Sequence, residues 1–146
     1  MADLQMALAE AVKLNRSISR FLEFTTYPAY NDLSGLDIDF HDGGQLLIWD
    51  ELRRITERLA DVQAYISYLS QPVIEESRLT KGTAGKYRTA KGHYYDCTSV
   101  IEALVSDEYR EAPYWTITSV EHSGKDYYLI GRKDVPMEGL RVRVRA

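Results

Sequence analysis

The sequence predicts an α+β protein in which a long N-terminal helical hairpin precedes a small antiparallel β-barrel, SH3-like or OB-like. Apolar residues recur at helical spacing as far as Leu69 and alternate after it. Pro72 follows the last helical position and cannot continue a helix. Charge divides at the same place: residues 1–77 carry 6 basic and 13 acidic side chains, and residues 78–146 carry 12 and 9. The net charge of −4 is therefore a balance of −7 and +3, and we expect domains over residues 1–77 and 78–146.

Composition places the chain among ordinary globular proteins. Of its 146 residues, 45% are hydrophobic and 27% are charged, which argues against disorder. The single cysteine, Cys97, excludes an intramolecular disulfide and favours a reducing compartment. No window approaches the roughly 18 apolar residues that a membrane helix needs, and the N-terminus does not resemble a signal peptide. We expect a cytoplasmic protein without membrane contact.

The first helix is predicted from an apolar seam near the N-terminus, with intervals of four and three residues that place its members on one face. The seam comprises Leu4, Leu8, Ala11, Asn15, Ile18 and Leu22.

A second, longer helix follows the same rule. Asp42, with Gln45 three residues later, predicts its N-terminal cap. Its expected seam comprises Ile48, Leu52, Ile55, Leu59, Val62, Ile66 and Leu69.

A narrow apolar seam requires a helical partner. That partner is either the other helix of the same chain, which we favour, or a second copy. Asn15 bears on the choice because a buried amide needs a hydrogen-bond partner, and a parallel homodimer would supply the second Asn15. A homodimer through the helices therefore stays open.

The connector between the helices, residues 25–44, is longer than the roughly 2–8 residues that a helical hairpin commonly uses. Within it, residues 36–41 alternate strictly between apolar and polar side chains, which predicts a strand.

The second half predicts a series of short strands, with Lys91 and Gly92 as a two-residue hairpin turn. For residues 100–105 a helical turn is the alternative to a strand. Residues 80–86, TKGTAGK, lack the spacing of a phosphate-binding loop, so we interpret them as a flexible basic linker. The expected strands cover residues 86–90, 93–97, 100–105, 114–122, 126–131 and 140–145.

The segments GKYRTAKGHYYDCTSVIEALV, YWTITSVEHSGKDYYLIG and VPMEGLRVRVR carry a family resemblance. Trp115, the Tyr127-Tyr128 pair and Gly139 are among its most telling residues. Over roughly residues 85–145 the chain resembles an uncharacterised bacterial family, domain of unknown function 5348. The resemblance implies an accessory protein of phages, plasmids or other mobile elements, and it brings no catalytic residues.

Evidence for an enzyme is thin. His93 and Cys97 are four residues apart and would share one face of a strand, but no third group orients them. Asp37, Asp39 and His41 would share another face, where a solvated acidic surface is a better interpretation than a metal site. We therefore expect a non-enzymatic protein without cofactor or metal.

An acidic surface is the leading candidate for a binding site. Six acids and no base lie between residues 31 and 52. Such a surface mimics a phosphate backbone or engages a basic groove on a protein partner, for example a nucleic-acid-binding nuclease. The corresponding function is an interaction or inhibitor protein, with an anti-defence role of the anti-CRISPR type as one form. The six residues are Asp32, Asp37, Asp39, Asp42, Asp50 and Glu51.

A basic surface supports the alternative function, a nucleic-acid-binding accessory module. Arg141, Arg143 and Arg145 have period two on the last strand, and guanidinium groups suit phosphates. Lys86 and Arg88 extend this surface, and neighbouring tyrosines would stack on bases. The competing structural interpretation is an edge strand that charge protects from pairing.

Overall fold

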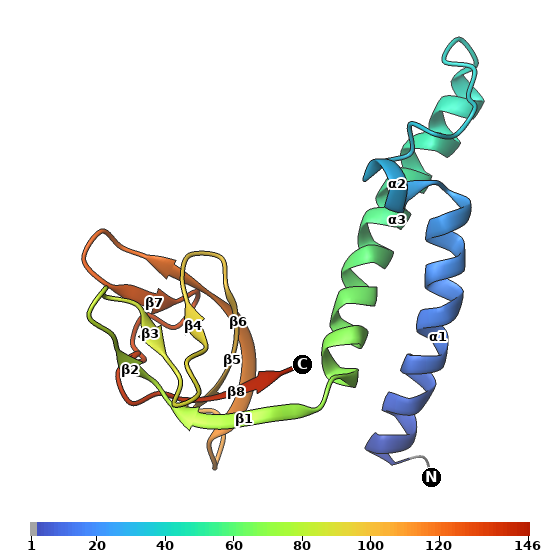
Figure 1. The fold of residues 1–146 in the computed structure, drawn as a ribbon. Helices are drawn as coiled ribbons and strands as arrows, with labels where there is room; N and C mark the ends of the chain where they lie inside the picture. Colours follow the sequence, from blue (N-terminus) through green and yellow to red (C-terminus); the bar gives the residue numbers. More distant parts are fainter. Residues whose placement is uncertain (1–2) are drawn as a thin grey trace. The chain divides into compact units, whose positions relative to one another are not determined.

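A computed structural model describes residues 3–146, which divide into a helical unit, residues 3–71, and a β unit, residues 72–146 (Figure 1). The α+β prediction is confirmed. No helix within residues 3–146 has the length and hydropathy of a membrane span. The helices are α1 (Leu4–Phe24), α2 (Tyr27–Tyr30) and α3 (Gly43–Ser70).

Both long helices begin at an aspartate cap. Asp3 accepts a hydrogen bond from the Met6 N–H at 2.8 Å. Asp42 Oδ1 accepts from Gly44 N at 2.9 Å and from Gln45 N at 3.2 Å, so the predicted start of α3 is confirmed. These contacts satisfy backbone donors that have no partner within the helix.

The helices α1 and α3 run side by side with opposite directions (Figure 1). Ile18 and Leu22 of α1 form a buried cluster with Ile66 of α3. Asn15 Nδ2 donates to Ser67 Oγ at 3.2 Å, so the amide nitrogen has a partner within its own chain, whereas the buried Oδ1 has none among residues 3–146.

The seam of α3 differs from the predicted one. Thr56, which the prediction leaves out, is completely buried, and its hydroxyl donates to Arg53 O at 2.9 Å. Four members of the expected seam are instead 40–61% exposed. The prediction is wrong here because a polar side chain that bonds its own helix is compatible with burial. The four exposed residues are Ile48, Ile55, Val62 and Leu69.

The strand predicted at residues 36–41 is also wrong, since this segment has no regular structure. No neighbouring strand accepts the hydrogen bond of Asp39 N; the side-chain oxygen Oε1 of Gln45 accepts it instead, at 3.0 Å. The apolar alternation reflects contact with α3: Leu36 and Ile38 line a hollow together with Trp49.

The β unit contains a five-stranded antiparallel sheet in the order β1-β8-β5-β6-β7 and a three-stranded sheet in the order β2-β3-β4. No closed barrel is found among residues 3–146, because β1 and β7, at the two ends of the larger sheet, do not pair. The SH3-like or OB-like detail stays a prediction. The short strands β2–β4 form their own sheet and leave both edges of the larger one open. The strands are β1 (Val73–Arg78), β2 (Thr80–Lys81), β3 (Tyr87–Arg88), β4 (Tyr94–Tyr95), β5 (Val100–Val105), β6 (Tyr114–His122), β7 (Tyr127–Leu129) and β8 (Arg141–Arg145).

Two parts of the chain are more ordered than the sequence predicts. Strand β1 begins before the expected domain boundary at residue 77, so residues 72–77 belong to the β unit and not to the helical one. The expected linker 80–86 contains β2 and a turn closed by Gly82 N donating to Lys86 O at 2.8 Å. A hairpin turn is present as predicted, but its loop has three residues, 90–92, and not two, because Thr89 N donates to His93 O at 2.7 Å. Gly92 N donates to Thr89 O at 3.1 Å, and Gly92 has the φ of +92° that ends such a loop. The strands around it, β3 and β4, are shorter than expected.

The core of the β unit joins its two sheets. Leu79, Tyr87 and Tyr95, from the region of the small sheet, pack with residues of the large sheet. The remaining buried members are Ile101, Ala103, Val105, Val120, Leu129, Met137, Leu140 and Val142.

A buried carboxylate connects β1 to the small sheet. Glu75, 7% exposed, accepts hydrogen bonds from Thr89 Oγ1 at 2.7 Å and from Lys91 N at 3.0 Å. Its Oε1 lies 2.8 Å from His93 Nδ1, and Ser77 Oγ donates to Oε2 at 3.0 Å. Burial alone would raise the pKa of Glu75, but these hydrogen bonds outweigh burial and lower it to about 2.

We expect Glu75→Gln to destabilise the β unit by about 3 kcal/mol at neutral pH, since an amide cannot accept all of these bonds. The folded-state pKa lies below the unfolded value, so the stabilisation is present above pH 4.5 and is lost as the pH falls towards 2. Urea unfolding from pH 7 to pH 3 should show the gap between wild type and variant closing on the acid side. The exposed Glu111→Gln is the control, and an unchanged gap would contradict the prediction.

Candidate functional site

The arginine row of β8 lies between two glutamates of the neighbouring strands. Glu76 of β1 lies 3.9 Å from Arg141 and 3.6 Å from Arg143. Glu102 of β5 lies 3.7 Å from Arg143 and 2.7 Å from Arg145. Antiparallel pairing places these residues opposite one another, because Arg143 is in register with both glutamates. Much of the positive charge predicted for this surface is therefore neutralised within the sheet.

The exposed fraction of the arginine side chains decreases along β8 from Arg141 to Arg145. The side chain of Arg141 is 46% exposed, that of Arg143 is 29% and that of Arg145 is 16%. Arg143 also lies over the ring of Trp115, 4.0 Å from its centroid. Glu102 is buried, and a carboxylate at this depth requires a charged partner. The inner part of the row thus stabilises the sheet, and Arg141 at its end is the most accessible.

The other predicted basic residues lie on the small sheet. Lys86 is 3.6 Å from Asp96 and 4.8 Å from the ring centroid of the exposed Tyr94. Arg88 is exposed. Tyr87 and Tyr95 are buried in the core, so they offer no stacking surface to a base.

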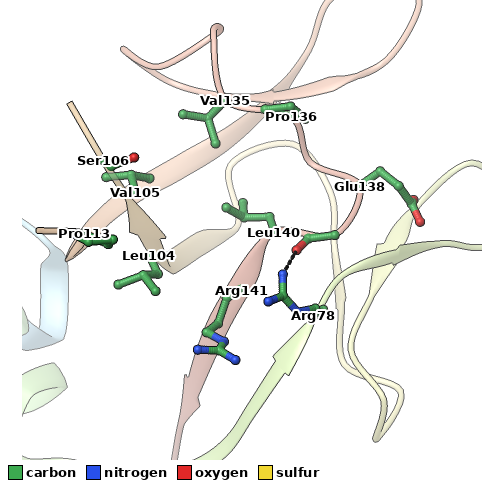
Figure 2. Close-up of a pocket in the computed structure, with 11 residues that line it drawn as sticks. Arg78, Leu104, Val105, Ser106, Pro113, Val135, Pro136, Glu138, Leu140 and Arg141 are labelled. Carbon is green, nitrogen blue, oxygen red and sulfur yellow. Dashed lines mark hydrogen bonds between the residues drawn. The ribbon is translucent and has the colours of Figure 1, made fainter. Parts of the chain in front are cut away.

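A cavity of about 310 Å³ lies where β5 ends and β8 begins (Figure 2). Arg78 and Arg141, directly opposite in register, both line it. Arg78 donates to Gly139 O at 3.1 Å, as the dashed line in Figure 2 shows. The two cations are partly balanced by carboxylates, because Glu138 also lines the cavity and Arg141 lies 3.9 Å from Glu76. The apolar lining consists of Leu104, Val105, Pro113, Val135, Pro136 and Leu140.

The six acidic residues divide by local role. Asp32 accepts from Ser34 N at 2.8 Å, and hydrogen bonds from Ser34 lower its pKa. Asp39 accepts from His41 N at 2.9 Å, and Asp42 caps α3. Glu51 lies 3.2 Å from Arg54. These four acids thus have structural partners in turns or on the helix.

The remaining two acids are placed differently. Asp37 is exposed and lines the smaller of two hollows around Trp49, whereas Asp50 is half-buried on α3. Asp37 therefore offers its charge to a partner more directly than Asp50.

The acidic connector partly encloses an apolar pocket. This pocket, about 480 Å³, has Asp32 and Arg53 among its polar lining residues. Trp49 is half-buried, and its Nε1–H is buried without a hydrogen-bond partner among the described residues. Phe40 packs edge-on against it with ring centroids 6.0 Å apart, yet is itself 62% exposed. The apolar lining residues are Leu33, Leu36, Ile38, Phe40 and Trp49.

The arrangements considered for chemistry are not assembled. His93 precedes β4 and contacts Glu75, whereas Cys97 follows β4 and is exposed, so the two do not share a strand. Within residues 3–146, no group of three or more His, Cys, Asp or Glu side chains is arranged to hold a metal ion.

Sequence reasoning missed Trp49, Phe40 and Arg78 as site residues. A tryptophan on an amphipathic helix is more often part of a core, and nothing in the sequence shows that the connector leaves space beside it. Arg78 lies in strand β1, whose sequence VIEESR is two apolar residues followed by four polar ones, so no alternation in the sequence marks this strand.

Residues 72–146 thus form a small two-sheet antiparallel β domain, and its strands contain the segments that carry the family resemblance. Residues 77–144 match the family model described as "Domain of unknown function (DUF5348)". The match confirms the predicted resemblance and begins eight residues earlier than residue 85. Neither a search of curated proteins nor a search of solved structures found a match.

We expect Glu102→Gln to destabilise the protein by about 3–5 kcal/mol, because it removes the carboxylate from two partly buried arginines. Glu76→Gln is the matched control. It removes a carboxylate from Arg143 at a site where the glutamate side chain is 43% exposed, so we expect at most about 1 kcal/mol. Urea denaturation at neutral pH measures the loss of unfolding free energy in both variants. Equal losses would contradict the expected difference between the buried Glu102 and the exposed Glu76.

Proposed function

We propose that this protein is a non-enzymatic protein-interaction module. In this proposal α1, the connector and α3 act as one helical hairpin, and the pocket beside Trp49 binds a basic segment of a protein partner through an apolar anchor. The observation that carries the proposal is an apolar pocket of about 480 Å³ within the most acidic stretch of the chain.

Charge and shape support the same occupant. Asp32 lines this pocket, and Asp37 lines the adjoining hollow. Arg53 also lines the pocket, 5.9 Å from the centroid of the Trp49 ring. A basic side chain of the partner would therefore bind on the side of Asp32 and Asp37, beside an apolar anchor. The unpartnered Trp49 Nε1–H is a donor for a carbonyl oxygen of the bound segment.

An inhibitor role is one form of this proposal. A phage or mobile-element origin, and with it an anti-defence activity of the anti-CRISPR type in the cytoplasm, is supported by the family resemblance alone. The partner in that case is a protein with a basic groove, such as a nucleic-acid-binding nuclease.

The nucleic-acid-binding alternative depends on Arg141, the most exposed arginine of β8, together with Arg78. The glutamates within the arginine row weaken it, since they compete with phosphate for the same guanidinium groups. A gel shift at low salt that is abolished by Arg141→Ala would favour this alternative.

Peptide display against the full chain tests the proposal. We expect selected peptides to combine a large apolar residue with lysine or arginine, and to bind with an affinity that falls as salt increases. The double variant Asp32→Asn, Asp37→Asn should weaken binding at least about tenfold. Asparagine at position 32 still provides an oxygen for Ser34 N, so the turn is preserved.

The matched control is Glu57→Gln, Asp61→Asn, which removes two charges from exposed positions of α3. Fluorescence anisotropy of a labelled selected peptide compares the variants. Selected peptides without basic residues, or equal affinity for both double variants, would refute the proposal.

A further inference from the structure

One side of the helical pair has an apolar surface that is left uncovered. The packed seam follows a heptad pattern: α1 contributes Leu8, Asn15 and Leu22 at one of its two positions, and α3 contributes Thr56 and Gln63. The residue directly before each of these, and before Trp49 and Ser70 at the same heptad position of α3, belongs to the flank of the seam. On both helices these seven flanking positions are apolar and carry no charge, and Phe21 among them also packs partly against the buried cluster. The flanking residues are Ala7, Leu14, Phe21, Ile48, Ile55, Val62 and Leu69.

The two flanks lie on the same side of the pair. Antiparallel helices are related by a two-fold axis normal to the plane that contains them, so equivalent heptad positions face one side. Leu14 is 54% exposed, Ile55 45% and Val62 40%. We call the seven flanking residues the flank face.

The opposite side of the pair is closed. Small side chains allow the helices to approach there, and hydrogen bonds join Asn15 to Ser67 and Gln63 to Ser19. Single large apolar side chains are exposed elsewhere on the helices, Val12 on this opposite side among them. The flanking positions differ because they are apolar in every turn of both helices, and such a continuous face is typical of an interaction surface.

We propose that the flank face is the interface of a homodimer, in which two helical pairs form a four-helix bundle. An uncharged face offers a foreign partner no ionic complementarity, whereas a second copy supplies an apolar face of equal length and spacing. Two-fold symmetry brings flank against flank and encloses a continuous apolar core.

The available area is sufficient. Helices that overlap over about 20 residues extend about 30 Å, and two helices packed side by side are about 20 Å wide. Each copy would contribute on the order of 600 Å², and a specific interface needs about 1,000 Å² in total.

Light scattering and sedimentation on the full chain test this inference. We expect the wild type to have twice the 16.7 kDa mass of one chain and to dissociate on dilution. The double variant Ile55→Glu, Val62→Glu should be monomeric. The control Ala9→Glu, Ala64→Glu adds the same charge at exposed positions outside the flank face and should remain dimeric.

Circular dichroism establishes that each variant is helical. Leu14→Ser provides a milder test on the other helix, with at least a tenfold increase in the dimer dissociation constant expected. A monomeric wild type at millimolar concentration would overturn the inference, as would a dimer that survives both flank variants. Peptide binding at the Trp49 pocket is measured separately, so failure of one proposal is distinguishable from failure of the other.

Discussion

The hydrogen bonds to Glu75 are the contact on which the arrangement of the β unit most depends. The donors lie between Ser77 and His93, so one carboxylate holds the small sheet against the first strand of the large one. A buried carboxylate without donors would be strongly unfavourable. The loop 89–93 must therefore adopt a conformation that presents its donors, and this requirement connects two sheets that share no strand ladder.

Glu102 in the large sheet is a second buried carboxylate that requires polar partners. Its charge is matched by arginines from β8, which the antiparallel register places beside it. The net charge of the β half therefore says little about its surface, because several of its cations are paired within the sheet. In the helical half, acids of the connector cap α3 or turn the chain, and Asp37 offers its charge outward.

The sequence predicts elements well where local chemistry determines them. Residues 100–105 and 114–122 are strands with the expected bounds, and Asp42 caps α3 as expected. Long-range contacts account for the errors. Nothing near Glu75 indicates that its donors lie up to 18 residues away, and the burial of Thr56 depends on how α1 packs. The alternation at residues 36–41 reports a buried face, which a helix supplies here in place of a sheet.

The error in the seam of α3 has a physical meaning. The most apolar line along this helix is Ile48, Ile55, Val62 and Leu69 together with Leu52, Leu59 and Ile66, and α1 covers mainly its second set. Prediction from apolar spacing selects the most hydrophobic stripe along a helix. Here the single partner helix, α1, buries only part of that stripe. The remainder is exposed on a pair whose opposite side is joined by hydrogen bonds. The predicted and observed seams therefore differ because α1 covers only part of the apolar surface of α3.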